Sequence, residues 1–310
     1  MKKILISSLL LTCGCTASNM GHEDIVVQEK GLYETVRILT STPKPRNFAN
    51  ISSLNLSASY IDSVFKLYSV RVYDEPFSVN GRTYRNIICS FGPENSERII
   101  IGAHYDVCFD QPGADDNASG VAGLLEVARL MSFYKPDLKN RIDLVAFTLE
   151  EPPFFRTENM GSAVHAKKLH ESGANVKLMI SLEMIGYFDE RPHSQQFPVG
   201  IPGWFYPDAG DFITIVTNMK SSFQGANLKR LMRKHARIGV EQLTAPALIE
   251  GVDFSDHLNF WKYGYKAVML TDTAFLRNPN YHKTTDTIDT LDFSKMPEVI
   301  KGLYFALIKM

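Results

Sequence analysis

Short apolar runs rich in β-branched residues recur along the chain and constrain its fold more than any other feature. They occur at residues 84–91, 97–106, 141–150, 176–188, 211–217 and 266–272. Several are continuously apolar, which is typical of strands that are covered on both faces. Segments with helical periodicity lie at 31–41, 53–69, 118–134, 160–172, 226–238 and 293–308. This order predicts an α/β fold with three layers, α/β/α, around a mixed, mostly parallel central sheet.

The N-terminus has the layout of an export signal. Residues 1–15, MKKILISSLLLTCGC, combine two early lysines, a short apolar stretch and small residues with cysteines. The stretch is too short to anchor the chain stably across a bilayer. It resembles a bacterial lipoprotein signal, in which Cys15 after Gly14 is lipidated; Cys13 after Thr12 fits less well. We therefore expect an exported protein, anchored by lipid and facing the periplasm, with plain secretion as the alternative.

The rest of the chain is expected to form one domain. Residues 16–30 are polar and are predicted to be a tether, and residues 31–310 a single domain. Cys89 and Cys108 adjoin strand-like runs, which favours buried thiols over a disulfide. The formal net charge of -1 and the lack of a basic block exclude a nucleic-acid partner. The sequence carries no signal for an oligomeric state.

Polar residues follow the predicted strands at the positions where open α/β sheets bind ligands. They are His104 and Asp106, Asp115 and Asp116, Glu150 and Glu151, Glu183, and His282. Each has an ordinary structural alternative: the acids of GADDNASG, for example, suit the N-terminus of the helix that follows. Glu183 within an apolar strand is different, because a buried carboxylate there requires a cation.

Taken together, these residues and their flanking motifs resemble the M28 family of zinc peptidases, which includes bacterial aminopeptidases. The resemblance covers about residues 85–290. The motifs are GAHYD at 102–106, GADDNASGVAGLLEVARL at 113–130, LEE at 149–151, GSAVHAKKL at 161–169, SLEMIGY at 181–187, FSDHLNFWKYGYKAVML at 254–270 and YHKTTDT at 281–287. The resemblance implies a zinc exopeptidase-like fold and two zinc ions, with cobalt and manganese as alternative metals.

The resemblance also assigns roles. One ion would be held by His104, Asp116 and Glu183, and the other by Asp116, Glu151 and His282, so that Asp116 bridges them. Imidazole and carboxylate ligands of this number suit zinc and leave room for a shared water. Asp106 is expected to accept the second ring N–H of His104. Glu150 is expected to act as general base on the bridging water, while Pro152 and Pro153 hold the strand end rigid.

Charge supports the metal assignment. Asp116, Glu150, Glu151 and Glu183 would bring four negative charges to one place and raise one another's pKa values. Two divalent cations offset them. The chain departs from the family pattern at Glu183, where aspartate is common. His257 is not expected to bind metal, because the resemblance assigns that role to His282, and Ser255 and Asp256 are expected to support the loop beside the site.

The predicted function is the removal of N-terminal residues from peptides by a metallo-aminopeptidase. Three alternatives stay open: a carboxypeptidase, in which Arg156 or Arg191 would hold the substrate carboxylate; a glutaminyl cyclase-like acyltransferase with one zinc; and a non-catalytic peptide-binding module. Phe154 and Phe155, in an unusually long link after Glu151, could wall a specificity pocket or pack in the core.

Overall fold

The computed structural model describes residues 25–201 and 203–310, so the predicted signal at 1–15, with Cys13 and Cys15, lies outside the described residues. The described chain forms eight strands: β1 (Val72–Val79), β2 (Arg82–Phe91), β3 (Arg98–His104), β4 (Arg141–Phe147), β5 (Val176–Glu183), β6 (Phe212–Thr217), β7 (Gly239–Thr244) and β8 (Ala267–Thr271). Its α-helices are α1 (Glu29–Thr40), α2 (Ile51–Tyr68), α3 (Gly120–Tyr134), α4 (Gly161–Glu171), α5 (Ser222–Arg233), α6 (His257–Lys262) and α7 (Met296–Lys309).

The strands form one sheet in the order β1-β2-β4-β3-β5-β8-β6-β7. The central strands β4, β3, β5 and β8 are parallel, and so are β6 and β7. The pairs β1–β2, β2–β4 and β6–β8 are antiparallel. This confirms the predicted mixed, mostly parallel sheet.

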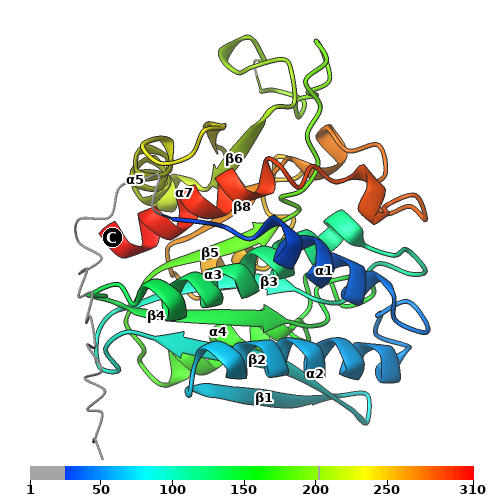
Figure 1. Cartoon of the computed structure of the whole chain (residues 1–310), viewed down its shortest axis with the longest axis vertical. Coiled ribbons are helices and arrows are strands. Elements are labelled where there is room, and N and C mark those ends of the chain that lie inside the picture. Colours follow the sequence, from blue (N-terminus) through cyan, green and yellow to red (C-terminus); the bar gives the residue numbers. More distant parts are fainter. Residues whose placement is uncertain (1–24, 202) are drawn as a thin grey trace, which may run out of the picture.

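Helices cover both faces of the sheet, as expected for three layers (Figure 1). The helices α1, α2, α3, α5 and α7 contact one another in one layer, and α4 contacts α6 in the other. The central strand β3 shows how the sheet separates two cores. Ile99 and Ile101 pack on the first side and Ile100 on the second, because successive side chains of a strand point to opposite faces. Such double burial explains the continuous apolar runs of the sequence.

The two edge strands and the shortest helix were not predicted. Half of the residues of β1 are exposed and the strand contains Pro76, while β7 is partly exposed along most of its length. An edge strand pairs with a neighbour on one side only and is less completely buried. It therefore lacks the continuous apolar run that marks a central strand. The helix α6 has six residues, too few to show a clear periodicity.

The fold also begins earlier than the predicted boundary at residue 31. Ile25 is buried, the amide of Gln28 donates to Glu126 Oε1 at 2.8 Å, and α1 starts at Glu29. Residues 25–30 therefore belong to the domain and not to a tether.

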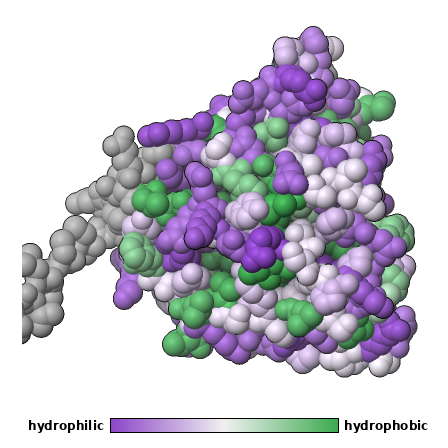
Figure 2. Space-filling model, turned by 45° about the vertical axis from the view of Figure 1, so that its right-hand side comes forward, coloured by the Kyte–Doolittle hydropathy of each residue, from purple (hydrophilic) through white to green (hydrophobic). Residues whose placement is uncertain are grey.

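The surface in Figure 2 is a mixture of hydrophilic and hydrophobic side chains, with the hydrophobic ones in small groups. Scattered apolar residues of this kind are normal on the surface of folded domains. Among the described residues, no helix has the length and apolar character needed to cross a membrane.

Candidate functional site

The candidate residues meet at the carboxyl edge of the central sheet. His104 is the last residue of β3 and Glu183 the last of β5. Glu150 and Glu151 follow the end of β4, and His282 lies in the loop after β8. Because these four strands are parallel, their carboxyl ends lie at one edge. The sheet topology therefore brings together the positions that the sequence singled out.

Asp116 lies between the two histidines. Its Oδ1 is 3.4 Å from His104 Nε2, and its Oδ2 is 3.2 Å from His282 Nε2. Asp116 is 2% exposed. Each carboxylate oxygen thus faces a different imidazole, which is the arrangement a bridging ligand needs.

Each histidine also faces a second carboxylate. Glu183 Oε2 lies 3.4 Å from His104 Nε2, and Glu151 Oε2 lies 3.4 Å from His282 Nε2. Possible ligand atoms of His104, Asp116 and Glu151 also lie within 4.8 Å of one another. Two groups of donors therefore share Asp116, and Glu151 is near both histidines.

Glu150 lies on the His104 side of the site. Its Oε2 is 3.9 Å from His104 Nε2, and it is 6% exposed. The direction of Glu150 and Glu151 is fixed by Asp106, whose Oδ1 accepts the amide of Glu150 at 3.2 Å and whose Oδ2 accepts the amide of Glu151 at 3.1 Å. One buried carboxylate thereby holds the backbone of both glutamates.

This changes the role expected for Asp106. The nearest acceptor to His104 Nδ1 is the backbone carbonyl of Asp106, at 3.2 Å, and its carboxylate is 3.7 Å away. The carboxylate is occupied by the two amides. Asp106 therefore orients His104 through its main chain and the two glutamates through its side chain.

The loop that carries Asp116 is held from three sides. Asp286 accepts the amides of Asp115 and Asp116 at 2.9 and 3.1 Å. Asn117 Oδ1 accepts the amides of Gly120 and Met184, both at 3.1 Å. The side chain of Asn117 therefore accepts the first amide of α3. Asp115 instead accepts the amide of Gly186 at 3.0 Å and the side-chain amide of Asn278 at 2.7 Å, and so links separate loops.

Arg46 holds the same loop in place by hydrogen bonds to its backbone. It is 1% exposed, and its guanidinium donates to the carbonyls of Leu39, Tyr105, Pro112 and Gly113. No sequence pattern predicts a role for Arg46, because it lies far before the metal motifs in a short loop between two helices. Ser255, which is expected from its place in FSDHLNFW to support the site, donates its hydroxyl to Glu183 Oε2 at 2.7 Å.

The site contains more buried acidic groups than its two histidines can balance. Burial, together with neighbouring acids, raises the pKa values of Glu150, Glu151 and Glu183. Burial also lowers the pKa of His282, but hydrogen bonds to Asp116 and Cys108 outweigh it and bring that pKa to about 10. Both histidines are therefore drawn toward the charged form by the surrounding acids, since the pKa of His104 is raised as well.

Glu151 gives a direct sign of a missing partner. Its Oε1 is buried and has no hydrogen-bond partner among the described residues. A buried acceptor without a partner is costly, and more so when it is charged. The donor set of imidazoles and carboxylates fits divalent zinc, with oxygen-preferring ions such as manganese as competitors.

An apolar pocket adjoins the site. Glu183 and Tyr281 are in its wall on the side of the candidate ligands, and its apolar lining includes Val216, Leu243, Phe254, Met269, Phe275 and Leu276. The pocket lies between β5, β6, β8 and the loop before α6. Glu183 therefore belongs both to the wall of this pocket and to the donor group around His104.

Phe154 and Phe155 do not line this pocket. Phe154 is 8% exposed and packs edge-on against Phe48, at 5.5 Å between ring centroids. Phe155 packs against Phe254 at 5.9 Å. Core packing is therefore the correct interpretation for Phe154, and the pocket wall comes from other segments.

Three other residues considered from sequence lie outside the donor groups. His257 is fully buried, its Nε2 lies 2.9 Å from the carbonyl of Val252, and burial lowers its pKa to about 4. Arg156 forms an ion pair with Asp253 at 2.5 Å, and Arg191 pairs with Asp189 at 2.5 Å. Both arginines are thus engaged with carboxylates of the chain itself. Cys89 and Cys108 are free buried thiols, as predicted.

Several known proteins are similar to this chain in sequence. An uncharacterized protein, YfbL, of Escherichia coli (strain K12) is 47% identical over 280 residues, which cover 88% of this chain and 85% of that protein. A probable leucine aminopeptidase of Trichophyton verrucosum is 27% identical over 228 residues, covering 70% of this chain and 54% of that protein. The chain thus spans about half the length of this fungal relative.

Solved structures show the same fold. The Legionella pneumophila LapA aminopeptidase has a TM-score of 0.72 at 20% identity, covering 91% of this chain and 72% of that one. A Bacteroides thetaiotaomicron glutaminyl cyclase bound to N-acetylhistamine has a TM-score of 0.70 at 19% identity, covering 92% and 99%. The sequence pattern of Peptidase family M28 matches residues 86–304, which contain every candidate ligand. The chain belongs to Peptidase family M28.

Proposed function

We propose that this protein is a zinc-dependent aminopeptidase with two metal ions. The observation that carries the proposal is the position of Asp116, with one oxygen 3.4 Å from His104 Nε2 and the other 3.2 Å from His282 Nε2. Glu183 completes the first ligand group and Glu151 the second. Two zinc ions would also neutralise the surplus of buried acid.

The residues divide the chemistry between them. When bound, the two ions polarise the scissile carbonyl and lower the pKa of the attacking water. Glu150 accepts a proton from that water on a carboxylate oxygen and gives it to the nitrogen of the departing amine. The carboxylate of Asp106 keeps Glu150 in place by accepting the backbone amide of Glu150. Burial, which raises the pKa of Glu150, suits a group that must both accept and release a proton.

The adjoining pocket supports an apolar residue at the substrate N-terminus. Its lining of Val216, Leu243, Phe254, Met269 and Phe275 offers aliphatic and aromatic surface, which suits side chains such as leucine, methionine or phenylalanine. The name of the fungal relative, a probable leucine aminopeptidase, points the same way. Arg156 and Arg191 are paired with Asp253 and Asp189, which weighs against recognition of a substrate C-terminus by these arginines.

A glutaminyl cyclase is the rival within the fold. Structures of both kinds resemble the chain about equally, with TM-scores of 0.72 and 0.70, so the fold does not choose between them. The two ligand groups that share Asp116 favour the peptidase, since the rival uses one zinc.

Export and lipid attachment belong to the same proposal, supported by the sequence of residues 1–15 alone. Cys15→Ser should move the protein from the membrane fraction to the soluble periplasmic fraction. A variant that stays in the membrane fraction and is processed as before would contradict lipid attachment at Cys15.

The central experiment combines metal counting with a substrate panel. The purified protein should bind two zinc ions per chain and release leucine, methionine or phenylalanine from aminoacyl amides. N-blocked peptides should be resistant, and chelation should abolish activity until zinc is restored. One zinc per chain with cyclisation of N-terminal glutamine peptides would instead establish the rival.

A further inference from the structure

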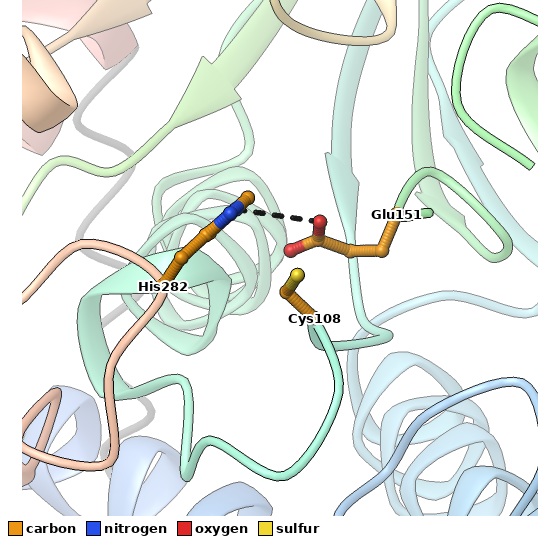
Figure 3. A group of neighbouring side chains, drawn as sticks. All are labelled: Cys108, Glu151 and His282. Atoms are coloured by element: carbon orange, nitrogen blue, oxygen red, sulfur yellow. Dashed lines mark ion pairs between the residues drawn. The ribbon is translucent and has the colours of Figure 1, made fainter. Parts of the chain in front are cut away.

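Cys108 lies inside the site although no motif pointed to it. It is in the loop after β3, four residues beyond His104, and is 2% exposed. Its Sγ, a carboxylate oxygen of Glu151 and a ring nitrogen of His282 all lie within 4.8 Å of one another. Figure 3 shows the sulfur and the imidazole both facing the Glu151 carboxylate, from three separate loops.

A second observation indicates that a cation binds beside Cys108. Glu151 is 4% exposed, its Oε2 faces His282 at 3.4 Å, and its Oε1 is buried without a hydrogen-bond partner among the described residues. Ligand atoms of one tetrahedral zinc ion lie about 3 to 4 Å apart, since each is about 2.0 to 2.3 Å from the metal. The sulfur, the imidazole and the carboxylate need only small movements to reach such a geometry.

We propose that Cys108 Sγ is a fourth protein ligand of the ion held by Asp116, Glu151 and His282. This inference rests on the proposed function, because the ion belongs to the same pair. On binding, the thiol gives its proton to solvent as the bond between sulfur and metal forms. The ion near Cys108 would thus have sulfur, nitrogen and oxygen ligands. The other ion, at His104, Asp116 and Glu183, would have nitrogen and oxygen ligands only.

The two ions then differ in function. Four protein ligands close a zinc site, whereas three leave a position for water or substrate. The ion near Cys108 is therefore held more tightly and serves mainly to position Asp116. The open position belongs to the ion near His104, on the side where Glu150 lies 3.9 Å from the imidazole. A thiolate also favours zinc over manganese at the closed site.

The chain offers a matched control in Cys89. It is the other free cysteine of the described residues, is fully buried in β2, and packs in the apolar core with Ile87 and Leu144. Burial raises the pKa of its thiol to about 12. Cys89→Ser therefore removes a buried thiol without touching the candidate ligands.

The test uses cobalt as a spectroscopic probe, because a bond between thiolate and cobalt gives an intense charge-transfer band in the near ultraviolet. The wild-type protein and Cys89→Ser, each loaded with two Co²⁺ per chain, should show this band, and Cys108→Ser should lack it. Cys108→Ser should also bind one of its two zinc ions at least about 10-fold more weakly, in the range reported when groups around a metal are lost.

The outcomes separate this inference from the proposed function. A wild-type protein that binds two Co²⁺ without the band overturns sulfur ligation and leaves the two-metal peptidase intact. A band that persists in Cys108→Ser also overturns it. A wild-type protein that binds no cobalt and no zinc overturns both proposals. The wild-type spectrum decides the question even where Cys108→Ser folds poorly.

Discussion

Glu75 and Glu151 are both almost fully buried, at 8% and 4% exposure, yet their pKa values move in opposite directions. At Glu75 burial is outweighed by hydrogen bonds from His165 and Asn86, which lower the pKa to about 2. At Glu151 burial and the nearby charges of Asp116 and Glu150 raise it. One cluster contains its own counter-charges, and the other contains acids that only an added cation can balance.

The geometry of the Glu75 cluster explains its balance. His165 Nδ1 lies 3.0 Å from Glu75 Oε2, Asn86 donates to the same oxygen at 2.8 Å, and Lys168 Nζ is 3.4 Å from Oε1. A single carboxylate therefore has three donors on the α4 side of the sheet. The metal-site acids share two imidazoles. Buried charge in itself does not indicate a binding site; buried charge without partners does.

The largest expected effect is on catalysis. Glu150→Gln keeps the shape of the side chain but removes the base, so kcat should fall by about 10² to 10⁴, the usual contribution of general acid–base catalysis. Both zinc ions should remain bound, measured by metal analysis of the same sample. Glu158→Gln, an exposed acid in the same link, is the control. Near wild-type turnover with both metals bound would show that Glu150 is not the base.

The second expected effect is on metal and stability. Asp116→Asn should lose both ions, because the two carboxylate oxygens of Asp116 each face one of the two histidines. A metal at 100 times its dissociation constant stabilises the fold by about 2.7 kcal/mol. At about 2–4 °C per kcal/mol for large domains, chelation should lower the wild-type Tm by about 5–10 °C.

The matched variant is Asp115→Asn, next in the chain and equally buried. Its carboxylate bonds to Gly186 and Asn278 and not to a histidine, so its metal content should stay at two ions. Full metal content in Asp116→Asn, or a chelator that leaves Tm unchanged, would remove the contrast between the two clusters.

The third expected effect is on acid stability. The pKa of Glu75 is lowered in the folded state, so its contribution is present above its unfolded value of about 4.5 and is lost as pH falls toward about 2. A shift of that size corresponds to at most about 3 kcal/mol. Glu75→Gln should therefore be less stable than wild type at neutral pH, and the difference should shrink between pH 4.5 and 2.

Chemical unfolding at several pH values, with metal saturating, measures this effect. Asp74→Asn, a neighbouring acid on the exposed side of β1, is the control and should show a smaller difference. A Glu75→Gln difference that stays constant between pH 7 and pH 2 would mean that the carboxylate charge does not contribute.

The sequence could predict the cluster of candidate metal ligands around Asp116, but not the cluster formed by Glu75 and its partners. His104, Asp116, Glu151 and His282 follow parallel strands, whose carboxyl ends necessarily meet, and each stands in a motif. Glu75 lies in an edge strand that the pattern missed, and its partner His165 is 90 residues away on α4. Pairing of this kind depends on side-chain packing between layers, which periodicity does not encode.

The same reasoning explains Cys108 and Arg46. Cysteine beside an apolar run is compatible with core packing, and its direction toward His282 depends on the path of the loop after β3. Arg46 is buried because four carbonyls from two separate segments converge on it. Neither convergence has a local sequence signal, whereas the central strands and the longer helices follow from local patterns.

The smallest expected effect separates the donors of the Glu75 cluster. The Lys168 side chain is 50% exposed, whereas that of His165 is 5% exposed. Water screens the lysine, and exposed ion pairs contribute about 0.2–1 kcal/mol. Lys168→Gln should therefore lower the free energy of unfolding by less than about 1 kcal/mol. His165→Gln should cost more, because it removes the hydrogen bond that most lowers the pKa of Glu75. Urea unfolding of both variants at neutral pH compares them directly. If Lys168→Gln proves the more damaging, the charge of Glu75 is balanced from the solvent side, and the contrast with the metal-site cluster is one of exposure and not of internal partners.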